Sequence, residues 1–221
     1  MAGMIAVLDY GIGNLRSAEK ALVHLGAAAR LVTEPEEAES ASAVVLPGVG
    51  AFGRCAEALR ATGLDRAALM AVERGIPFLG ICVGFQLLYE GSDEAPRVPG
   101  LGVLPGKVRA LPDGVKHPQI QWNQLELVGT GSSSLSTDGN ARSGLLAGLG
   151  ERPWVYFVHS FAPEPTEDVV AFCDYGGPVV AASQRGKVWG TQFHPEKSGK
   201  NGLSILGNFV REVEAAAVSW G

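Results

Sequence analysis

The sequence predicts an α/β protein with a mostly parallel central sheet, helices on both of its faces, and a β-rich second half. Up to about residue 82, short apolar runs alternate with helical segments along the 221-residue chain. These runs are continuously apolar, which is typical of parallel strands buried on both faces. Beyond about residue 103 the helical segments give way to strands and hairpins, until a final helical segment closes the chain.

The first half reads as strands and helices in alternation. Strands are expected at 4–10, 29–32, 42–48 and 77–82, where the sequence reads MIAVLDY, ARLV, SAVVLPG and PFLGIC. Helices are expected from Asn14 to Leu25, from about Gly53 to Leu59 and from about Asp65 to Arg74. This alternation favours βαβ units, in which each helix crosses over between parallel strands.

The second half reads as β-structure. The expected strands are VRAL, QIQWNQLEL, WVYFVHSF, VVAFCDYG, PVVAAS and KVWGTQF, with PVVAASQRGKVWG as the clearest hairpin. In the last segment, GLSILGNFVREVEAAAV, apolar residues recur at helical spacing, which predicts an amphipathic helix against the core. The stretch 129–144 contains almost no apolar residue, so we expect a flexible surface loop there.

Composition bounds the function. Hydrophobic residues make up 46% of the chain and charged residues 19%, as in one globular domain spanning residues 1–221. A net charge of −5 provides no basic face for nucleic acid or anionic lipid, and no apolar run is long enough to span a membrane. Three cysteines without close pairing indicate reduced thiols and a cytoplasmic protein. No zinc-type spacing occurs, so we expect no metal and no cofactor.

Cys82 lies at a position typical of a catalytic nucleophile. Gly80-Ile81-Cys82-Val83-Gly84 places a thiol between glycines, after a strand and before a helix, which matches a strained strand–turn–helix elbow. At the start of a helix, free N–H groups favour a thiolate, and the Val83 N–H is placed to donate to an oxyanion. The alternative is a small buried core residue, which is the interpretation we give to Cys55 and Cys173.

A thiolate needs a base, and four histidines are candidates. His24 lies in a helical pattern, His117 in a loop and His159 in a strand, where surface or core roles are the ordinary ones. His194 precedes a proline and stands two residues before Glu196, whose carboxylate can orient the imidazole. The sequence therefore predicts a Cys82–His194–Glu196 triad.

Residues 48–53 raise a second possibility. The segment GVGAFG fits the G-x-G-x-x-G pattern of dinucleotide-binding turns, after a strand and before a helix. The acidic residue expected at the end of the next strand is absent, because that strand ends in Cys82. The glycines can equally form a loop whose backbone N–H groups face a developing negative charge.

Together these motifs resemble the triad glutamine amidotransferases of class I, and most of all the glutaminase subunits of imidazole glycerol phosphate synthases. The matching segments are LDYGIGNLRS, VVLPGVGAFG, GICVGFQLLYEGSDE, GLGVLPG, WNQL, YFVHS, FCDYG and QFHPEKSG. The DYGxGN start, PGVG and YFVHS distinguish this subunit from those of anthranilate, GMP and CTP synthesis. The resemblance implies a flavodoxin-like, class I glutamine amidotransferase-like fold.

The resemblance also implies roles for individual residues. Cys82 would attack the side-chain amide of glutamine, with His194 as base and then as acid to ammonia. The oxyanion would be held by Gly48, Val49, Gly50 and Val83, and the substrate by Gln86, Glu94, His159 and Ser160. Glu94 would face the substrate's α-amino group.

A partner is implied in the same way. The family's glutaminase subunit forms a heterodimer with a (β/α)₈-barrel cyclase, which receives the ammonia through a channel and makes imidazole glycerol phosphate and an aminoimidazole carboxamide ribotide. Asn14, Trp122, Tyr156 and Lys197 match interface positions. Gln121 departs from the family, where a glycine precedes the Trp-Asn pair.

Three classes of function remain open. The chain could be this amidotransferase subunit or one of another pathway, a stand-alone cysteine amidase or peptidase, or a non-catalytic interaction subunit. The intact Cys82, His194 and Glu196 argue against the last, and Glu94 with the PGVG segment argues against the second.

Overall fold

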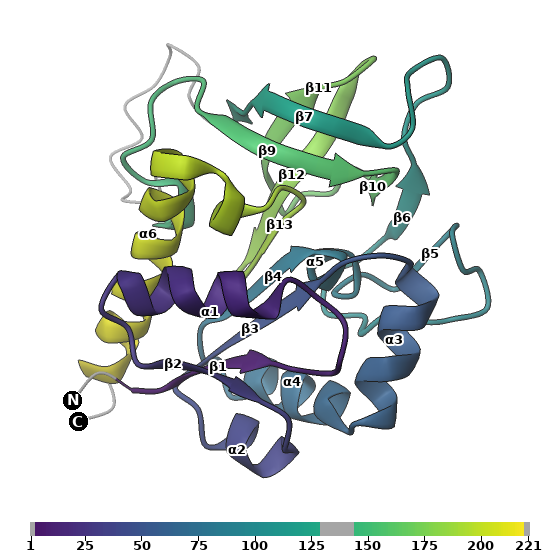
Figure 1. Cartoon of the computed structure of the whole chain (residues 1–221). Coiled ribbons are helices and arrows are strands. Elements are labelled where there is room, and N and C mark those ends of the chain that lie inside the picture. Colours follow the sequence, from purple (N-terminus) through teal and green to yellow (C-terminus); the bar gives the residue numbers. More distant parts are fainter. Residues whose placement is uncertain (1–2, 129–143, 219–221) are drawn as a thin grey trace.

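The computed structural model describes residues 3–128 and 144–218. Its main feature is an eight-stranded sheet in the order β2-β1-β3-β4-β13-β12-β11-β8 (Figure 1). The expected loop at 129–144 lies outside the described residues, except for Gly144, which begins the 3₁₀ turn η1 (Gly144–Leu146).

The first half of the chain forms the parallel part of the sheet. Its strands are β1 (Ile5–Leu8), β2 (Ala29–Val32), β3 (Ala43–Gly48) and β4 (Phe78–Cys82), all mutually parallel where they pair. Every residue of β1, β3 and β4 is buried, because helices cover both faces. The predicted runs at 4–10, 42–48 and 77–82 are thus confirmed as central parallel strands, whereas the run at 29–32 forms the edge strand β2.

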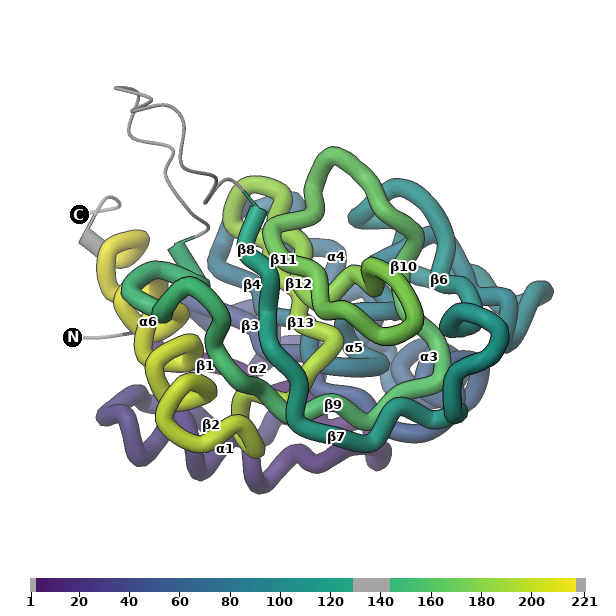
Figure 2. The backbone as a smooth tube through the Cα atoms, turned by 90° about the horizontal axis from the view of Figure 1, so that it is seen from above, coloured from purple at the N-terminus to yellow at the C-terminus, as the bar shows by residue number. Residues whose placement is uncertain are grey.

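Helices pack on opposite faces of this sheet. One face carries α1 (Leu15–His24) and the long C-terminal α6 (Gly199–Val218), while α2 (Pro35–Glu39), α3 (Phe52–Ala61) and α4 (Leu64–Glu73) lie on the other (Figures 1 and 2). The fold class predicted from the sequence is therefore confirmed. The short helix α2 was not expected, since PEEAE contributes only Ala38 to the core.

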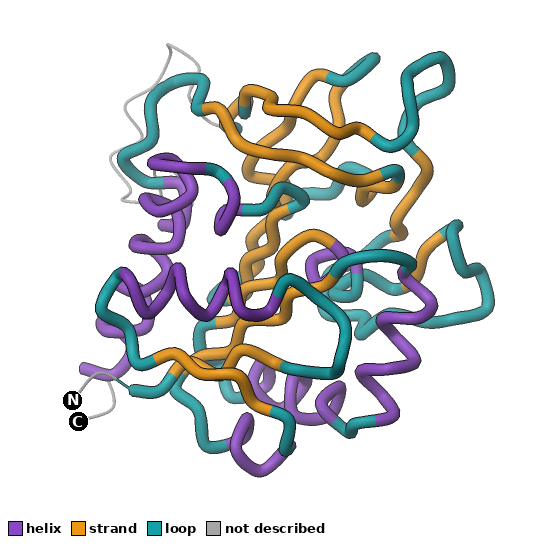
Figure 3. The backbone as a smooth tube through the Cα atoms, viewed as in Figure 1, coloured by secondary structure: helices purple, strands orange, loops and turns teal. Residues whose placement is uncertain are grey.

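The second half extends and caps the sheet with strands (Figure 3). The hairpin of β12 (Pro178–Arg185) and β13 (Val188–Thr191) forms as predicted, with Arg185 opposite Val188. β11 (Val169–Asp174) and β8 (Glu126–Leu127) continue the sheet in antiparallel fashion. β13 itself runs parallel to β4, and this pairing joins the two halves of the chain.

Two segments expected as single strands each divide between two sheets. QIQWNQLEL splits into β7 (Gln119–Gln124) and β8, and WVYFVHSF splits at Ser160 into β9 (Trp154–His159) and β10 (Phe161–Pro163). β7 and β9 pair as a two-stranded sheet, whereas β10 joins β6 (Lys107–Ala110) and β5 (Gly91–Ser92).

The register brings three strand ends together. Gly48 of β3 lies beside Cys82 of β4, and Ile81 lies beside Thr191 of β13. Because parallel strands end at the same edge of a sheet, the segments that follow β3, β4 and β13 converge there. The candidate site is built at this edge.

Candidate active site

Cys82 lies at a strained turn between β4 and the one-turn helix α5 (Val83–Gln86). Its φ is 55° and its ψ is −112°, and it has the only positive φ among non-glycine residues in the described part of the chain. Such a backbone costs about 1–3 kcal/mol and persists where surrounding structure enforces it. This is the geometry expected of a nucleophile elbow.

The flanking glycines are required by close backbone approach. A Cβ at Gly84 would lie 1.8 Å from the carbonyl oxygen of Leu46, in β3. A Cβ at Gly80 would lie 2.9 Å from the carbonyl oxygen of Gly84. Only glycine lets α5 turn back onto the end of β3, and this packing fixes the position of the thiol.

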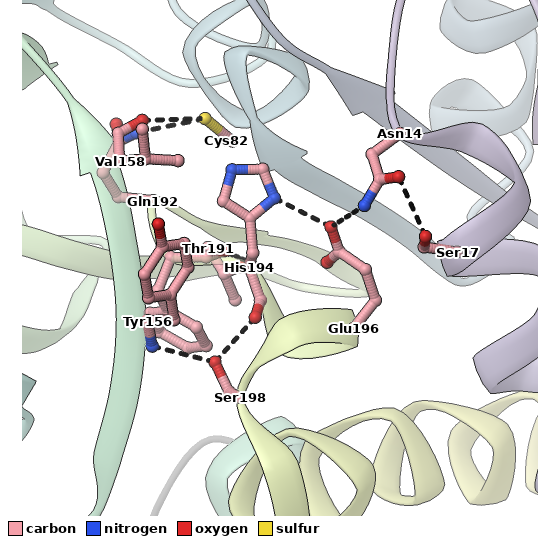
Figure 4. Close-up of polar contacts among 11 residues, drawn as sticks. Asn14, Ser17, Cys82, Tyr156, Val158, Thr191, Gln192, His194, Glu196 and Ser198 are labelled. Atoms are coloured by element: carbon pink, nitrogen blue, oxygen red, sulfur yellow. Dashed lines mark hydrogen bonds and ion pairs between the residues drawn. The ribbon is translucent and has the colours of Figure 1, made fainter. Parts of the chain in front are cut away.

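His194 and Glu196 follow β13 and face the elbow (Figure 4). His194 Nδ1 lies 2.8 Å from Glu196 Oε1, and the two side chains are only 1% and 2% exposed. Because a carboxylate accepts, Nδ1 carries the proton and Nε2 is left as the base. His194 Nε2 has no hydrogen-bond partner among the described residues, and both His194 and Cys82 line one pocket.

The surroundings of His194 favour its charged form. Burial would lower the pKa of His194, but the contacts with Cys82 and Glu196 outweigh it and raise the pKa above its ordinary value. A protonated histidine beside a thiol can give its proton to a leaving group. The site can therefore supply a nucleophile and a proton at once.

Further hydrogen bonds hold the histidine segment in place (Figure 4). The Ser198 hydroxyl donates to the His194 carbonyl at 2.6 Å and accepts from the Tyr156 N–H at 3.0 Å. Asn14 Nδ2 donates to Glu196 Oε1 at 3.3 Å, and the Ser17 hydroxyl in turn donates to Asn14. Asn14, which was expected at an interface, thus contacts the Glu196 carboxylate, and no sequence pattern indicates this contact.

The segment Gly48-Val49-Gly50 borders Cys82. Val49, Gly50 and Val83 line the same pocket as Cys82, and Gly50 has a φ of 88°. The Tyr10 hydroxyl donates to the Pro47 carbonyl at 2.6 Å, and the Cys55 thiol lies 3.3 Å from the Val49 carbonyl. Two buried side chains therefore contact the carbonyls of the Pro47–Gly48 and Val49–Gly50 peptides on either side of the Gly48–Val49 peptide.

The pocket has a volume of about 250 Å³, which suits a small polar molecule. Its lining includes all four residues expected to bind substrate, namely Gln86, Glu94, His159 and Ser160. Pro118, from the loop before β7, also lines it and was not expected. A larger cavity of about 560 Å³ near Arg74 lies beside the start of β3 and β4 and contains none of these groups.

Glu94 is fixed at the mouth of the pocket. Its Oε2 accepts the Phe52 N–H at 2.8 Å, at the first residue of α3. In a dinucleotide-binding turn a pyrophosphate would accept such N–H groups. Here a carboxylate does so, and this argues against the dinucleotide interpretation of residues 48–53.

His159 is held neutral in the wall of the pocket. Burial lowers the pKa of His159 to about 4, and its Nδ1 donates to the Phe161 carbonyl at 2.9 Å. Nε2 is buried and has no partner among the described residues. With Nδ1 as the donor, this nitrogen is an acceptor.

Acid should destabilise the fold through His159. Because its folded pKa lies below the unfolded value of about 6.5, the stability is complete above pH 6.5 and falls as the pH drops toward 4, by up to about 3 kcal/mol. Urea unfolding between pH 4.5 and 7.5 should show a shallower loss in His159→Gln than in the wild type. His24→Gln, at an exposed helical position, is the matched control and should keep the wild-type slope. Equal slopes in all three would contradict this account of His159.

The expected interface residues lie on or beside one surface. Trp122 and Tyr156 face each other across β7 and β9 with ring centroids 6.1 Å apart, and Lys197 is exposed in the turn η2 (Pro195–Lys197). Gln121, exposed on β7, pairs with Phe157 of β9. Ile120 and Trp154 lie on the same face as Trp122 and were not singled out from the sequence.

In residues 3–128 and 144–218, no group of three or more His, Cys, Asp or Glu side chains is arranged to hold a metal ion. No helix of the described residues is long and apolar enough to cross a membrane. The three cysteines are free and buried.

Comparison with known proteins gives a consistent result. Residues 6–213 match the model of the glutamine amidotransferase class-I family. The chain is 46% identical to the imidazole glycerol phosphate synthase subunit HisH of Methanothermobacter thermautotrophicus, over 96% of this chain and 100% of that protein. It is 47% identical to the subunit of the same name from Synechococcus sp. (strain JA-3-3Ab), over 95% and 94%.

Solved structures resemble the fold at lower identity. A glutamine amidotransferase crystal structure superposes with a TM-score of 0.71 at 23% identity, over 95% of this chain and 98% of that one. PurLQS from Thermotoga maritima superposes with a TM-score of 0.68 at 21% identity, over 100% and 99%.

Proposed function

Because this chain belongs to the class-I glutamine amidotransferase family, and within it to the imidazole glycerol phosphate synthase subunits HisH, we propose that it hydrolyses glutamine to glutamate and ammonia for histidine biosynthesis. The chain would act as a single domain that needs no metal or cofactor for this step. The observation that carries the proposal is the strained Cys82 in a pocket shared with the His194–Glu196 pair.

The reaction follows from the placement of these groups. The Cys82 thiolate attacks the side-chain carbonyl carbon of glutamine, and the carbonyl oxygen becomes an oxyanion near the Val83 N–H and residues 48–50. The His194 imidazolium gives its proton to the departing ammonia, which leaves a thioester on Cys82. His194 then takes a proton from water, which attacks the thioester and releases glutamate.

The pocket supports recognition of the amino acid as well as of its amide. The Glu94 carboxylate, held by the Phe52 N–H, is placed to receive the α-ammonium group. His159, at the end of β9, and Ser160, between β9 and β10, also line the pocket. Gln86 also lines the pocket, but its amide nitrogen donates to Phe161 and Gln192.

A second subunit would receive the ammonia. The outward face of β7 and β9 carries Ile120, Trp122 and Trp154, which are 58%, 48% and 50% exposed. Such clustered apolar side chains mark a protein-binding surface. We assign it to the (β/α)₈-barrel cyclase, which would form a heterodimer with this chain and use the ammonia to make imidazole glycerol phosphate and an aminoimidazole carboxamide ribotide.

The surface adjoins the active site through β9. Tyr156 lies on the outward face, and its carbonyl accepts the His194 N–H at 3.0 Å. Asn14, which contacts Glu196, and Lys197, beside Glu196 in the chain, complete the proposed interface. A partner bound there would contact residues next to the catalytic base.

The test is glutamate release by the purified chain, alone and with its cognate cyclase and the cyclase's nucleotide ligand. Strong stimulation by the pair supports the proposal. Full activity alone, without a response to the cyclase, would favour a stand-alone amidase. A folded protein that is silent under both conditions would favour a non-catalytic interaction subunit.

A further inference from the structure

Gln192 occupies a buried position beside Cys82, and it is not among the residues that line the pocket. It follows β13, as Cys82 follows the paired residue Ile81 of β4, so the parallel register carries the two side by side. Its side chain is fully buried, and its Nε2 lies 3.8 Å from Cys82 Sγ (Figure 4). That distance is within the range of an N–H···S hydrogen bond.

The orientation of the Gln192 amide is fixed by its neighbours. The Phe161 carbonyl can only accept, so the Gln86 atom 2.9 Å from it must be the NH₂ group. That NH₂ group donates its second N–H to Gln192 Oε1 at 3.0 Å. The Gln192 NH₂ group is therefore the one that faces the sulfur.

The sulfur thus has one donor and one acceptor beside it. The Val158 carbonyl, 3.9 Å from Sγ, accepts the S–H of the neutral thiol. The Gln192 N–H interacts favourably with the thiolate, since a hydrogen bond to the charged form favours that form. If Cys82 loses its proton to His194, the sulfur can no longer donate to the Val158 carbonyl, and it becomes a better acceptor for the Gln192 N–H.

We propose that Gln192 is a positioning residue that holds the Cys82 thiolate for attack and that Gln86 acts by fixing the Gln192 amide. The role of Gln192 in turnover rests on the proposed glutaminase function. Its effect on the reactivity of Cys82 is independent of that function, because it can be measured without glutamine.

The experiment measures alkylation of Cys82 by iodoacetamide against pH, with the Cys82 peptide quantified by mass spectrometry. In Gln192→Leu the pH of half-maximal rate should rise by about one unit, which is a tenfold loss at fixed lower pH. Gln192→Met has nearly the same length, offers no N–H to the sulfur and should raise that pH by a similar amount. If the Leu variant does not fold, the Met variant carries the test.

Asn208→Leu is the matched control. Asn208 is another buried amide, whose Nδ2 donates to the Leu145 and Ala147 carbonyls at 2.8 Å in both cases, away from the pocket. This variant should lose stability and keep the wild-type alkylation profile. A wild-type profile in a folded Gln192 variant, or an equal shift in Asn208→Leu, would overturn the proposal.

Turnover gives a second readout. With the cyclase present, Gln192→Leu should lower kcat about tenfold and leave KM within about twofold, because Gln192 touches the nucleophile and not the substrate. A change in KM alone would overturn the positioning role. A shifted alkylation profile in a protein that never hydrolyses glutamine would instead refute the proposed function and leave the Gln192 contact standing.

Discussion

Cys82→Ala should lose glutaminase activity by about 10⁴-fold or more, since removal of a nucleophile from a working triad disables the whole unit. The fold should survive, because the substitution deletes one buried sulfur and keeps the Cβ. Glutamate release in the presence of the cyclase measures the loss, and circular dichroism checks the fold. Substantial activity in the folded variant would exclude Cys82 as the nucleophile.

Cys82→Gly tests the backbone strain at residue 82 independently of catalysis. Glycine accepts a φ of 55° without a Cβ penalty, so this variant should be more stable than Cys82→Ala by about 1–2 kcal/mol although it is equally inactive. Cys173→Gly, in the strand β11, should show the opposite order relative to Cys173→Ala. A Cys82→Gly protein less stable than Cys82→Ala would contradict the strained elbow.

Gly84→Ala should destabilise the protein by about 3 kcal/mol or more, because the new Cβ would overlap the backbone of β3 at Leu46. Backbone in a central strand cannot yield as a flexible side chain does. Activity should also fall, since a shifted α5 moves Cys82 relative to residues 48–50. Urea unfolding and glutamate release measure the two effects.

Gly150→Ala is the control for that substitution. Gly150 is exposed, and a Cβ there meets no atom within 4 Å. Its unfolding free energy should change by less than about 0.5 kcal/mol, as at ordinary surface sites. Equal stability of Gly84→Ala and Gly150→Ala would show that the elbow tolerates a side chain.

The parallel half of the fold was predictable because the burial of its strands determines the hydrophobic pattern of the sequence. Strands such as β3 and β4 are buried on both faces and therefore read as unbroken apolar runs. The antiparallel half was harder. Apolar residues stand at even positions in Ile120 and Trp122 and at odd positions in Leu125 and Leu127, so the phase shifts where QIQWNQLEL leaves one sheet for another. That shift marks a break in the strand, but it does not tell which sheet each part joins.

The site shows the same division. The sequence shows the glycines around Cys82, which the tight turn requires, and the carboxylate two residues after His194, which can orient the imidazole. Both patterns are local, so they can be recognised without knowing the fold. The Gln192 and Asn14 contacts depend on which segments the fold brings together. A glutamine amide can hydrogen-bond to many groups. Gln192 lies next to the Cys82 sulfur because of the register in which β4 pairs with β13.

The most direct test of the account is covalent capture of the nucleophile with 6-diazo-5-oxo-L-norleucine, an electrophilic analogue of glutamine. The cyclase-bound protein should gain one adduct, located by peptide mass spectrometry on Cys82, and glutamine should protect against it. Labelling on Cys55 or Cys173, or no labelling of a folded and cyclase-bound protein, would contradict the assignment of Cys82 as the residue that attacks glutamine.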